Sequence, residues 1–146
     1  MDRYLVFGHP VRHSKSPFIH TLFARQTQQA LEYGLAEPAV DEFASALNHF
    51  FAEGGKGCNV TVPFKLDAYR WVQHHSERAR LAEAVNTFRF EADGVHGDNT
   101  DGIGLVRDIT QNAGVALRGA RVLLVGAGGA GAGALGPLLS ERPAEL

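Results

Sequence analysis

Apolar residues follow two alternating spacings along this chain, and that alternation constrains the fold more than any other feature. Short apolar runs of the kind found in β-strands occur at residues 4–7, 31–36, 58–62, 85–90, 95–96 and 121–125. Between them, apolar side chains recur at the spacing of one helix face in residues 16–23, 40–51, 66–72, 76–83 and 101–113. Strands that alternate with helices in this way predict an α/β fold.

Turn and capping residues mark several of the boundaries. The pair Asp93-Gly94 predicts a hairpin between the two apolar runs on either side of it. Ser16 followed by Pro17 predicts a helix that begins with the Ser16 side chain as its N-cap. Pro63 cannot donate to a strand ladder, so the run at residues 58–62 should end there.

Composition and charge exclude several classes of protein. The formal net charge is −2 and no block of like charge occurs, which argues against a nucleic-acid partner. No apolar run approaches the roughly 20 residues of a membrane span, and the N-terminal run is too short for a signal peptide, so we expect a cytoplasmic protein. Cys58 has no cysteine partner and should be a buried small hydrophobe. The seven histidines show no zinc-site spacing, so no metal site is predicted.

Two polar segments stand where strands are predicted to end, and each holds one group capable of proton transfer. NVTVPFK (residues 59–65) ends in the amine of Lys65, and GDNTDG (residues 97–102) contains the carboxylate of Asp101. An amine and a carboxylate that meet in a cleft can hold and move a proton. Considered singly, Lys65 would be interpreted as a solvated lysine and Asp101 as an acid at a helix N-terminus. The prediction of proton transfer therefore depends on the two residues lying together.

A glycine-rich turn follows the last apolar run. Its residues are Gly126, Ala127, Gly128, Gly129 and Ala130. Glycines after a strand and before a helix let the backbone approach a pyrophosphate, which the N-terminus of the following helix then faces. This context predicts a dinucleotide-binding turn.

Five motifs, in this order and spacing, resemble those of shikimate dehydrogenases. They are VFGHPVRHSKSP at residues 6–17, NVTVPFK at 59–65, AVNT at 84–87, GDNTDG at 97–102 and GAGGA at 126–130. The resemblance extends from Met1 to about residue 140. It implies the reversible NADP-dependent reduction of 3-dehydroshikimate to shikimate. It also implies an N-terminal α/β substrate domain with a mixed sheet at residues 1–100, and at residues 101–146 a linker helix and the first β-α unit of an NADP-binding Rossmann domain.

The resemblance assigns roles to individual residues. It implies that Lys65 gives and takes the proton and that Asp101 positions both Lys65 and the substrate, with the division of the proton between them left open. The substrate-binding set that it implies is Ser14, Ser16, Asn59, Thr61, Lys65, Asn86 and Asp101. In the family the two serines hold the substrate carboxylate, and Thr61 and Asn86 contact ring hydroxyls. The implied cofactor-binding set is Glu77, Gly126, Ala127, Gly128, Gly129 and Ala130.

The end of the chain departs from the family pattern. After GAGGA, three interior glycines fall within six residues and a usual basic residue is missing, so we expect a weak helix. The chain stops as a second Rossmann strand should begin, so we expect an incomplete chain whose residues 121–146 are loosely held. A non-catalytic shikimate-binding fragment and an NAD-dependent quinate/shikimate dehydrogenase are the alternatives. The predicted partner is a small-molecule substrate, and a homodimer stays open.

Overall fold

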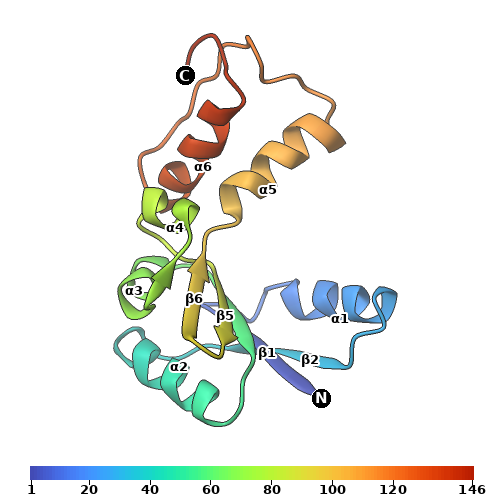
Figure 1. The fold of residues 1–146 in the computed structure, drawn as a ribbon, viewed down its shortest axis with the longest axis vertical. Helices are drawn as coiled ribbons and strands as arrows, with labels where there is room; N and C mark the ends of the chain where they lie inside the picture. The colour runs from blue at the N-terminus through green and yellow to red at the C-terminus, as the bar shows by residue number, and fades with distance from the viewer.

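A mixed β-sheet forms the centre of the computed structural model, which describes residues 1–146 (Figure 1). Its strand order is β2-β1-β3-β5-β6-β4. The strands are β1 (Asp2–Phe7), β2 (Leu31–Ala36), β3 (Gly57–Val60), β4 (His74–His75), β5 (Thr87–Glu91) and β6 (Gly94–Asp98). β1 is parallel to β2 and β3, and β4 is parallel to β6, whereas β5 is antiparallel to both of its neighbours. The predicted mixed α/β sheet is confirmed.

Helices connect the strands, and none of them has the length and apolar character needed to cross a lipid bilayer. The α-helices are α1 (Ser16–Gln26), α2 (Phe43–Ala52), α3 (Lys65–Trp71), α4 (Glu77–Ala82), α5 (Asp101–Arg107) and α6 (Gly129–Ser140). A 3-10 turn, η1 (Val40–Glu42), precedes α2, and a π-helical turn, η2 (Asp108–Asn112), continues α5. The predicted helices and hairpin are therefore present, with boundaries shifted by a few residues.

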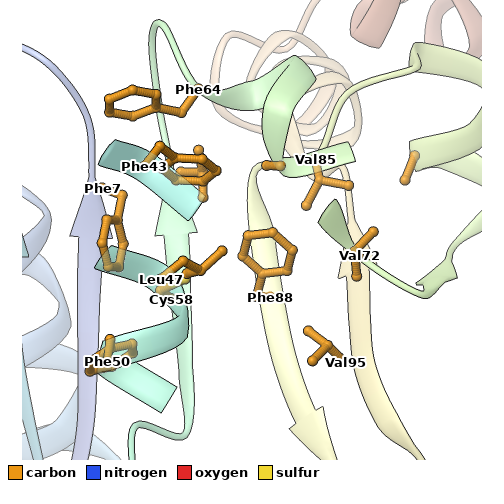
Figure 2. Packing of buried hydrophobic residues seen from close by; sticks show 13 residues of the cluster. Phe7, Phe43, Leu47, Phe50, Cys58, Phe64, Val72, Val85, Phe88 and Val95 are labelled. Atoms are coloured by element: carbon orange, nitrogen blue, oxygen red, sulfur yellow. The ribbon is translucent and has the colours of Figure 1, made fainter. Parts of the chain in front are cut away.

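The main hydrophobic core lies between the sheet and the helices α2 and α3. Figure 2 shows Phe43, Leu47 and Phe50 packed on the strands, as the spacing of the predicted helix face requires. Cys58 is buried in this cluster, and burial raises the pKa of its thiol, in keeping with its predicted role as a small hydrophobe. Phe7 lies here whereas its neighbour Val6 lies in a smaller cluster on the opposite face, because successive strand residues point to opposite sides.

Helix α1 covers part of that opposite face but buries little of its own apolar surface. Ala24 is its one buried residue. The predicted apolar helix face is exposed instead, at Phe18, Ile19, Leu22 and Phe23. The helical spacing therefore predicted the helix correctly but did not predict that its apolar face would be exposed.

Two local predictions are wrong. The side chain of Ser16 does not cap α1: Lys15 is the N-cap residue, and the Ser14 hydroxyl donates to the Ser16 hydroxyl. Residues 121–125 form no strand, since only Arg121 makes a bridge, in parallel with Glu145. Leu123 is 87% exposed because no neighbouring strand covers it. The bridge at Glu145 does agree with a second strand beginning near the end of the chain.

Helix α6 forms despite its glycines and packs closely against α5 beyond the carboxyl end of β6, where Gly102 of α5 faces Gly133 of α6 (Figure 1). A Cβ added to Gly102 would lie well inside van der Waals contact with the carbonyl oxygen of Gly133. A small core of Val106, Leu117, Ala134 and Leu138 completes the contact. The helix expected to be weak is thus formed and packed, since helix propensity left out tertiary packing; that residues 121–146 are loosely held stays a prediction.

We predict opposite effects on stability for two glycines of α5. Gly102→Ala should lower the free energy of unfolding by about 1–3 kcal/mol, because its methyl group overpacks the contact with α6. Gly104→Ala is the matched control, since its Cβ meets no atom within 4 Å. It should be neutral or stabilise the chain by up to about 1 kcal/mol. Urea denaturation followed by circular dichroism measures both, and equal effects would show that α6 does not depend on this contact.

Candidate functional site

Lys65 and Asp101 meet at one edge of the sheet, although they are far apart in sequence. Lys65 begins α3 just after β3, and Asp101 begins α5 just after β6. β3 and β6 are both antiparallel to the strand β5 between them, so they run in the same direction and end at the same edge. Lys65 Nζ donates to Asp101 Oδ2 at 2.6 Å. Both side chains are partly buried, which screens this ion pair less than a fully exposed one.

Asn86 holds the other oxygen of the same carboxylate. It immediately precedes β5 and is 9% exposed. Its Nδ2 donates to Asp101 Oδ1 at 2.8 Å and to the Thr100 hydroxyl at 3.0 Å. Its Oδ1 accepts from the Thr100 backbone N–H at 3.0 Å. Asn86 therefore fixes Asp101 from the side opposite Lys65, and both of its donor hydrogens are engaged within the protein.

Asn59 of β3 is linked to Asn86 through the hydroxyl of Thr87. Its Oδ1 accepts from the Tyr33 hydroxyl at 2.6 Å, and its Nδ2 donates to the Thr87 hydroxyl at 3.1 Å. Burial raises the pKa of Tyr33, so that its hydroxyl stays a donor. Thr87 in turn donates to Asn86 Oδ1 at 2.9 Å. Asn59 finds the polar partners that an asparagine in a strand requires, and through them it supports Asn86.

The remaining substrate-binding predictions concern the loops after β1 and β3. Thr61 lies against Gly8, where an added Cβ would come within 2.5 Å of the Thr61 methyl group. The Ser14 hydroxyl donates to that of Ser16 at 3.1 Å and accepts from the Ser16 backbone N–H at 3.2 Å. No hydrogen bond links the two serines to Lys65 or Asp101. Their convergence on one substrate stays a prediction.

Asp98 ties helix α4 to the end of β6. Its carboxylate accepts from the Ser76 hydroxyl at 2.5 Å and pairs with the guanidinium of Arg78 through two hydrogen bonds. Burial alone would raise the pKa of Asp98, but the hydrogen bonds from Arg78 and Ser76 outweigh it and hold that pKa below its ordinary value. Ser76 also accepts from the Ala79 backbone N–H at 3.1 Å and so caps α4.

Of the predicted cofactor-binding residues, Glu77 lines a cleft between α4, α5 and α6. Glu77 and Arg78 of α4 line it opposite Gly136 and Pro137 of α6, around a volume of about 310 Å³. The glycine turn precedes the N-terminus of α6, where Gly126 has a φ of +118° that favours glycine. A Cβ at Gly126, Gly128 or Gly129 would meet no atom within 4 Å. The turn is therefore open to close approach by a ligand.

Several polar residues of the site were not predicted as functional, among them Thr100, Asn99 and Arg78. Thr100 shares Asn86 with Asp101. The side-chain oxygen of the buried Asn99 accepts from the Asp101 backbone N–H at 3.1 Å, which fixes the first turn of α5. The Gly-Asp-Asn sequence signalled a turn, and this asparagine-to-backbone bond is what such a turn provides. The ion pair of Arg78 had no signal in the sequence.

Comparison with known proteins decides the family. A model described as the shikimate dehydrogenase substrate binding domain matches residues 6–88, which is more than half of the chain. The chain belongs to the shikimate dehydrogenase family. The resemblance found in the five motifs is thereby confirmed.

Individual relatives cover the whole chain. The NADP(+) shikimate dehydrogenase of Aeromonas salmonicida is 71% identical over 147 residues, an alignment that covers 100% of this chain and 54% of that relative. An Ael1 enzyme from Pseudomonas putida matches at TM-score 0.96 and 52% identity, covering 100% of this chain and 54% of its own. Shikimate 5-dehydrogenase from Thermus thermophilus, in complex with NADP(H) and shikimate, matches at TM-score 0.89 and 29% identity, covering 99% and 54%. The chain spans about half the length of the curated relatives it matches.

We predict that Asp98→Asn destabilises the chain in a pH-dependent way. The pKa of Asp98 is lowered on folding, so its contribution is present above the unfolded value of about 3.9 and is lost as pH falls through the folded value. At neutral pH the loss should be on the order of 1–2 kcal/mol, because Arg78 is partly exposed.

Urea denaturation across the acid range measures this difference. Asp67→Asn is the control, since Asp67 and Arg70 form an exposed pair at 3.1 Å whose loss should change stability by less than about 0.5 kcal/mol. A constant deficit of Asp98→Asn down to the acid limit would contradict the assigned role of the charge.

Proposed function

We propose that this chain supplies the substrate site and the acid–base pair of an NADP-dependent shikimate dehydrogenase. The 2.6 Å contact between Nζ of Lys65 and Oδ2 of Asp101 carries the proposal, because it joins the two groups that the reaction needs. Two relatives support the substrate and cofactor by name. The Aeromonas salmonicida protein is an NADP(+) shikimate dehydrogenase, and the Thermus thermophilus structure contains shikimate and NADP(H).

Lys65 would move the proton. In the direction of oxidation, the neutral amine accepts the proton of the C3 hydroxyl of shikimate; in the direction of reduction, the ammonium returns it to the C3 carbonyl oxygen of 3-dehydroshikimate. Asp101 and Asn86 hold Lys65 in place, since the carboxylate accepts from both. Ser14 and Ser16 would bind the substrate carboxylate through their hydroxyls, and Thr61 would bind a ring hydroxyl. NADP, when bound, supplies the hydride acceptor and donor.

The glycine turn fits the pyrophosphate of a dinucleotide. Its backbone is unobstructed at Gly126, Gly128 and Gly129, and it leads into the N-terminus of a twelve-residue helix. Free backbone N–H groups and the positive end of the helix dipole at such a terminus favour phosphate. We assign Gly126, Ala127, Gly128, Gly129 and Ala130 to the pyrophosphate and Glu77 to the neighbouring wall of the cofactor cleft.

We predict that Lys65→Ala lowers turnover by roughly 10²–10⁴, the usual effect of losing an acid–base group. The assay would use this chain joined to the C-terminal half of the Aeromonas salmonicida relative, and would follow NADPH absorbance with shikimate as substrate. Lys56→Ala is the matched control: Lys56 is exposed and precedes β3, whereas Lys65 follows it. The control should keep its kcat, and a Lys65→Ala enzyme with nearly normal kcat would remove Lys65 from the chemistry.

The 146-residue chain alone should bind shikimate weakly and should not oxidise it with either NADP or NAD. The residues assigned to the substrate are present, whereas those assigned to the cofactor reach only the pyrophosphate and one wall of its cleft. Orientation of the reacting groups can contribute roughly 7–11 kcal/mol to lowering the barrier, and nothing assigned here orients the nicotinamide. Calorimetric titration with shikimate and an absorbance assay on one preparation separate the two outcomes. Turnover by a pure sample would contradict this prediction.

A further inference from the structure

A cluster of metal-ligating side chains lies at the edge of the sheet, where the short strand β4 meets the β5–β6 hairpin. It consists of His74 of β4, Asp93 of the hairpin turn and His96 of β6. Each offers one ligand atom, and these atoms all lie within 4.8 Å of one another. We propose that these three residues form a binding site for a divalent transition-metal ion, with Zn²⁺ as the representative.

The sheet itself aligns the two imidazoles. His74 and His96 are direct partners in the parallel register of β4 and β6. Their rings are stacked, with centroids 4.7 Å apart and planes 23° apart. Gly94 leaves room for this arrangement, because a Cβ there would come within 3.4 Å of the His74 ring. The positions of the ligands are therefore set by backbone pairing, not by the chance approach of flexible side chains.

Asp93 is already oriented toward both rings. His96 Nε2 donates to Asp93 Oδ1 at 2.9 Å, and His74 Nε2 donates to the Asp93 carbonyl oxygen at 3.2 Å. The metal would replace a ring hydrogen on one nitrogen of each imidazole, and the displaced hydrogen would move to the other ring nitrogen. Each ring would then coordinate as a neutral ligand, so no net proton is gained or lost.

The spacing suits a small ion with nitrogen ligands. Two ligand atoms at about 2.1 Å from one tetrahedral Zn²⁺ lie about 3.4 Å apart. Ligand atoms that now lie up to 4.8 Å apart must therefore move together by up to about 1.4 Å to complete the site. His74 and Asp93 are exposed and free to make that adjustment. Two imidazoles and one carboxylate select borderline transition metals over Mg²⁺ or Ca²⁺, which prefer oxygen ligands.

Glu91 is the nearest further carboxylate. Its Oε2 lies 3.7 Å from His96 Nε2, while its Oε1 pairs with Arg89 at 2.5 Å. The guanidinium of Arg89 places a positive charge beside the site and offsets part of the attraction to a cation. We therefore assign three protein ligands and leave the fourth position to water, which is the arrangement of an open zinc site.

The expected consequence is structural. β4 is two residues long and leads directly into Ser76 and helix α4. A metal ion would clamp this strand to the hairpin turn and so stabilise the folded chain, because the unfolded chain does not bring the three ligands together. Asp93 precedes β6 at the end of the strand opposite Asp98, whereas His96 lies at the middle of the strand, two residues before Asp98.

Isothermal titration calorimetry with ZnCl₂ on the untagged chain tests the proposal. Wild-type protein should bind one equivalent, and His74→Gln and His96→Gln should each weaken binding by at least about tenfold, since even the loss of an outer-shell partner costs 10–100-fold. His49→Gln is the matched control: it removes an exposed histidine that pairs with Glu53 on α2. It should leave the affinity unchanged, and MgCl₂ should give no binding.

Thermal unfolding of the same proteins gives a second readout. One equivalent of Zn²⁺ should raise the Tm of wild type and of His49→Gln, and should leave the Tm of the His74→Gln/His96→Gln double variant unchanged. Circular dichroism without metal confirms that every variant is folded. If the double variant binds Zn²⁺ as tightly as wild type, or if wild type binds none, the proposal is wrong.

Discussion

The buried amide of Asn86 is the interaction on which the candidate site depends. It stands where β5 begins, between the carboxyl ends of β3 and β6, and its side chain joins Asp101 to Thr100. A buried amide must satisfy both its donors and its acceptor, and here Thr100 and Asp101 provide the partners. Removing the amide would leave those partners without their bonds and would free the Asp101 carboxylate to rotate. The position of Lys65 follows from Asp101, so one amide sets the geometry of the proposed acid–base pair.

Glycine plays opposite roles at two levels of this structure. In an isolated helix, each interior glycine of α6 costs about 1 kcal/mol relative to alanine. In the folded chain, a Cβ on Gly133 would come within 3.3 Å of the Asn99 side chain, and a Cβ on Gly102 would collide with the Gly133 carbonyl oxygen, so the close packing here depends on both glycines. Local propensity and tertiary packing therefore point in different directions at the same residues. The helix forms because packing against α5 outweighs its intrinsic weakness.

The success of each sequence prediction depended on whether its cause was local or distant. The α2 face, the hairpin at Asp93-Gly94 and the Lys65–Asp101 pair rest on periodicity, turn chemistry and motif, and the structure contains all three. The strand at residues 121–125 needed a neighbour that only Arg121 finds. β4 was not predicted, because a strand of two residues is too short to show a hydrophobic period. The histidine cluster was not predicted either, because His74 and His96 are brought together only by the register of β4 and β6. Contacts between distant segments could be predicted only where a motif marked both partners, as for Lys65 and Asp101.

The segment from Asp98 to Asp101 connects the Lys65–Asp101 pair to helix α4, which lines the proposed cofactor cleft. Asp98 holds α4 through Arg78, and Asp101 is both the first residue of α5 and the anchor of Lys65. α5 packs against α6, which follows the glycine turn, so a rotation of this helix pair against the sheet would move the Asp101 carboxylate relative to Lys65. Asn99 opposes that rotation, since its amide donates to the Ala84 carbonyl while its oxygen accepts from the Asp101 backbone. The geometry of the proposed acid–base pair is thus coupled to the orientation of the helices that border the proposed cofactor cleft.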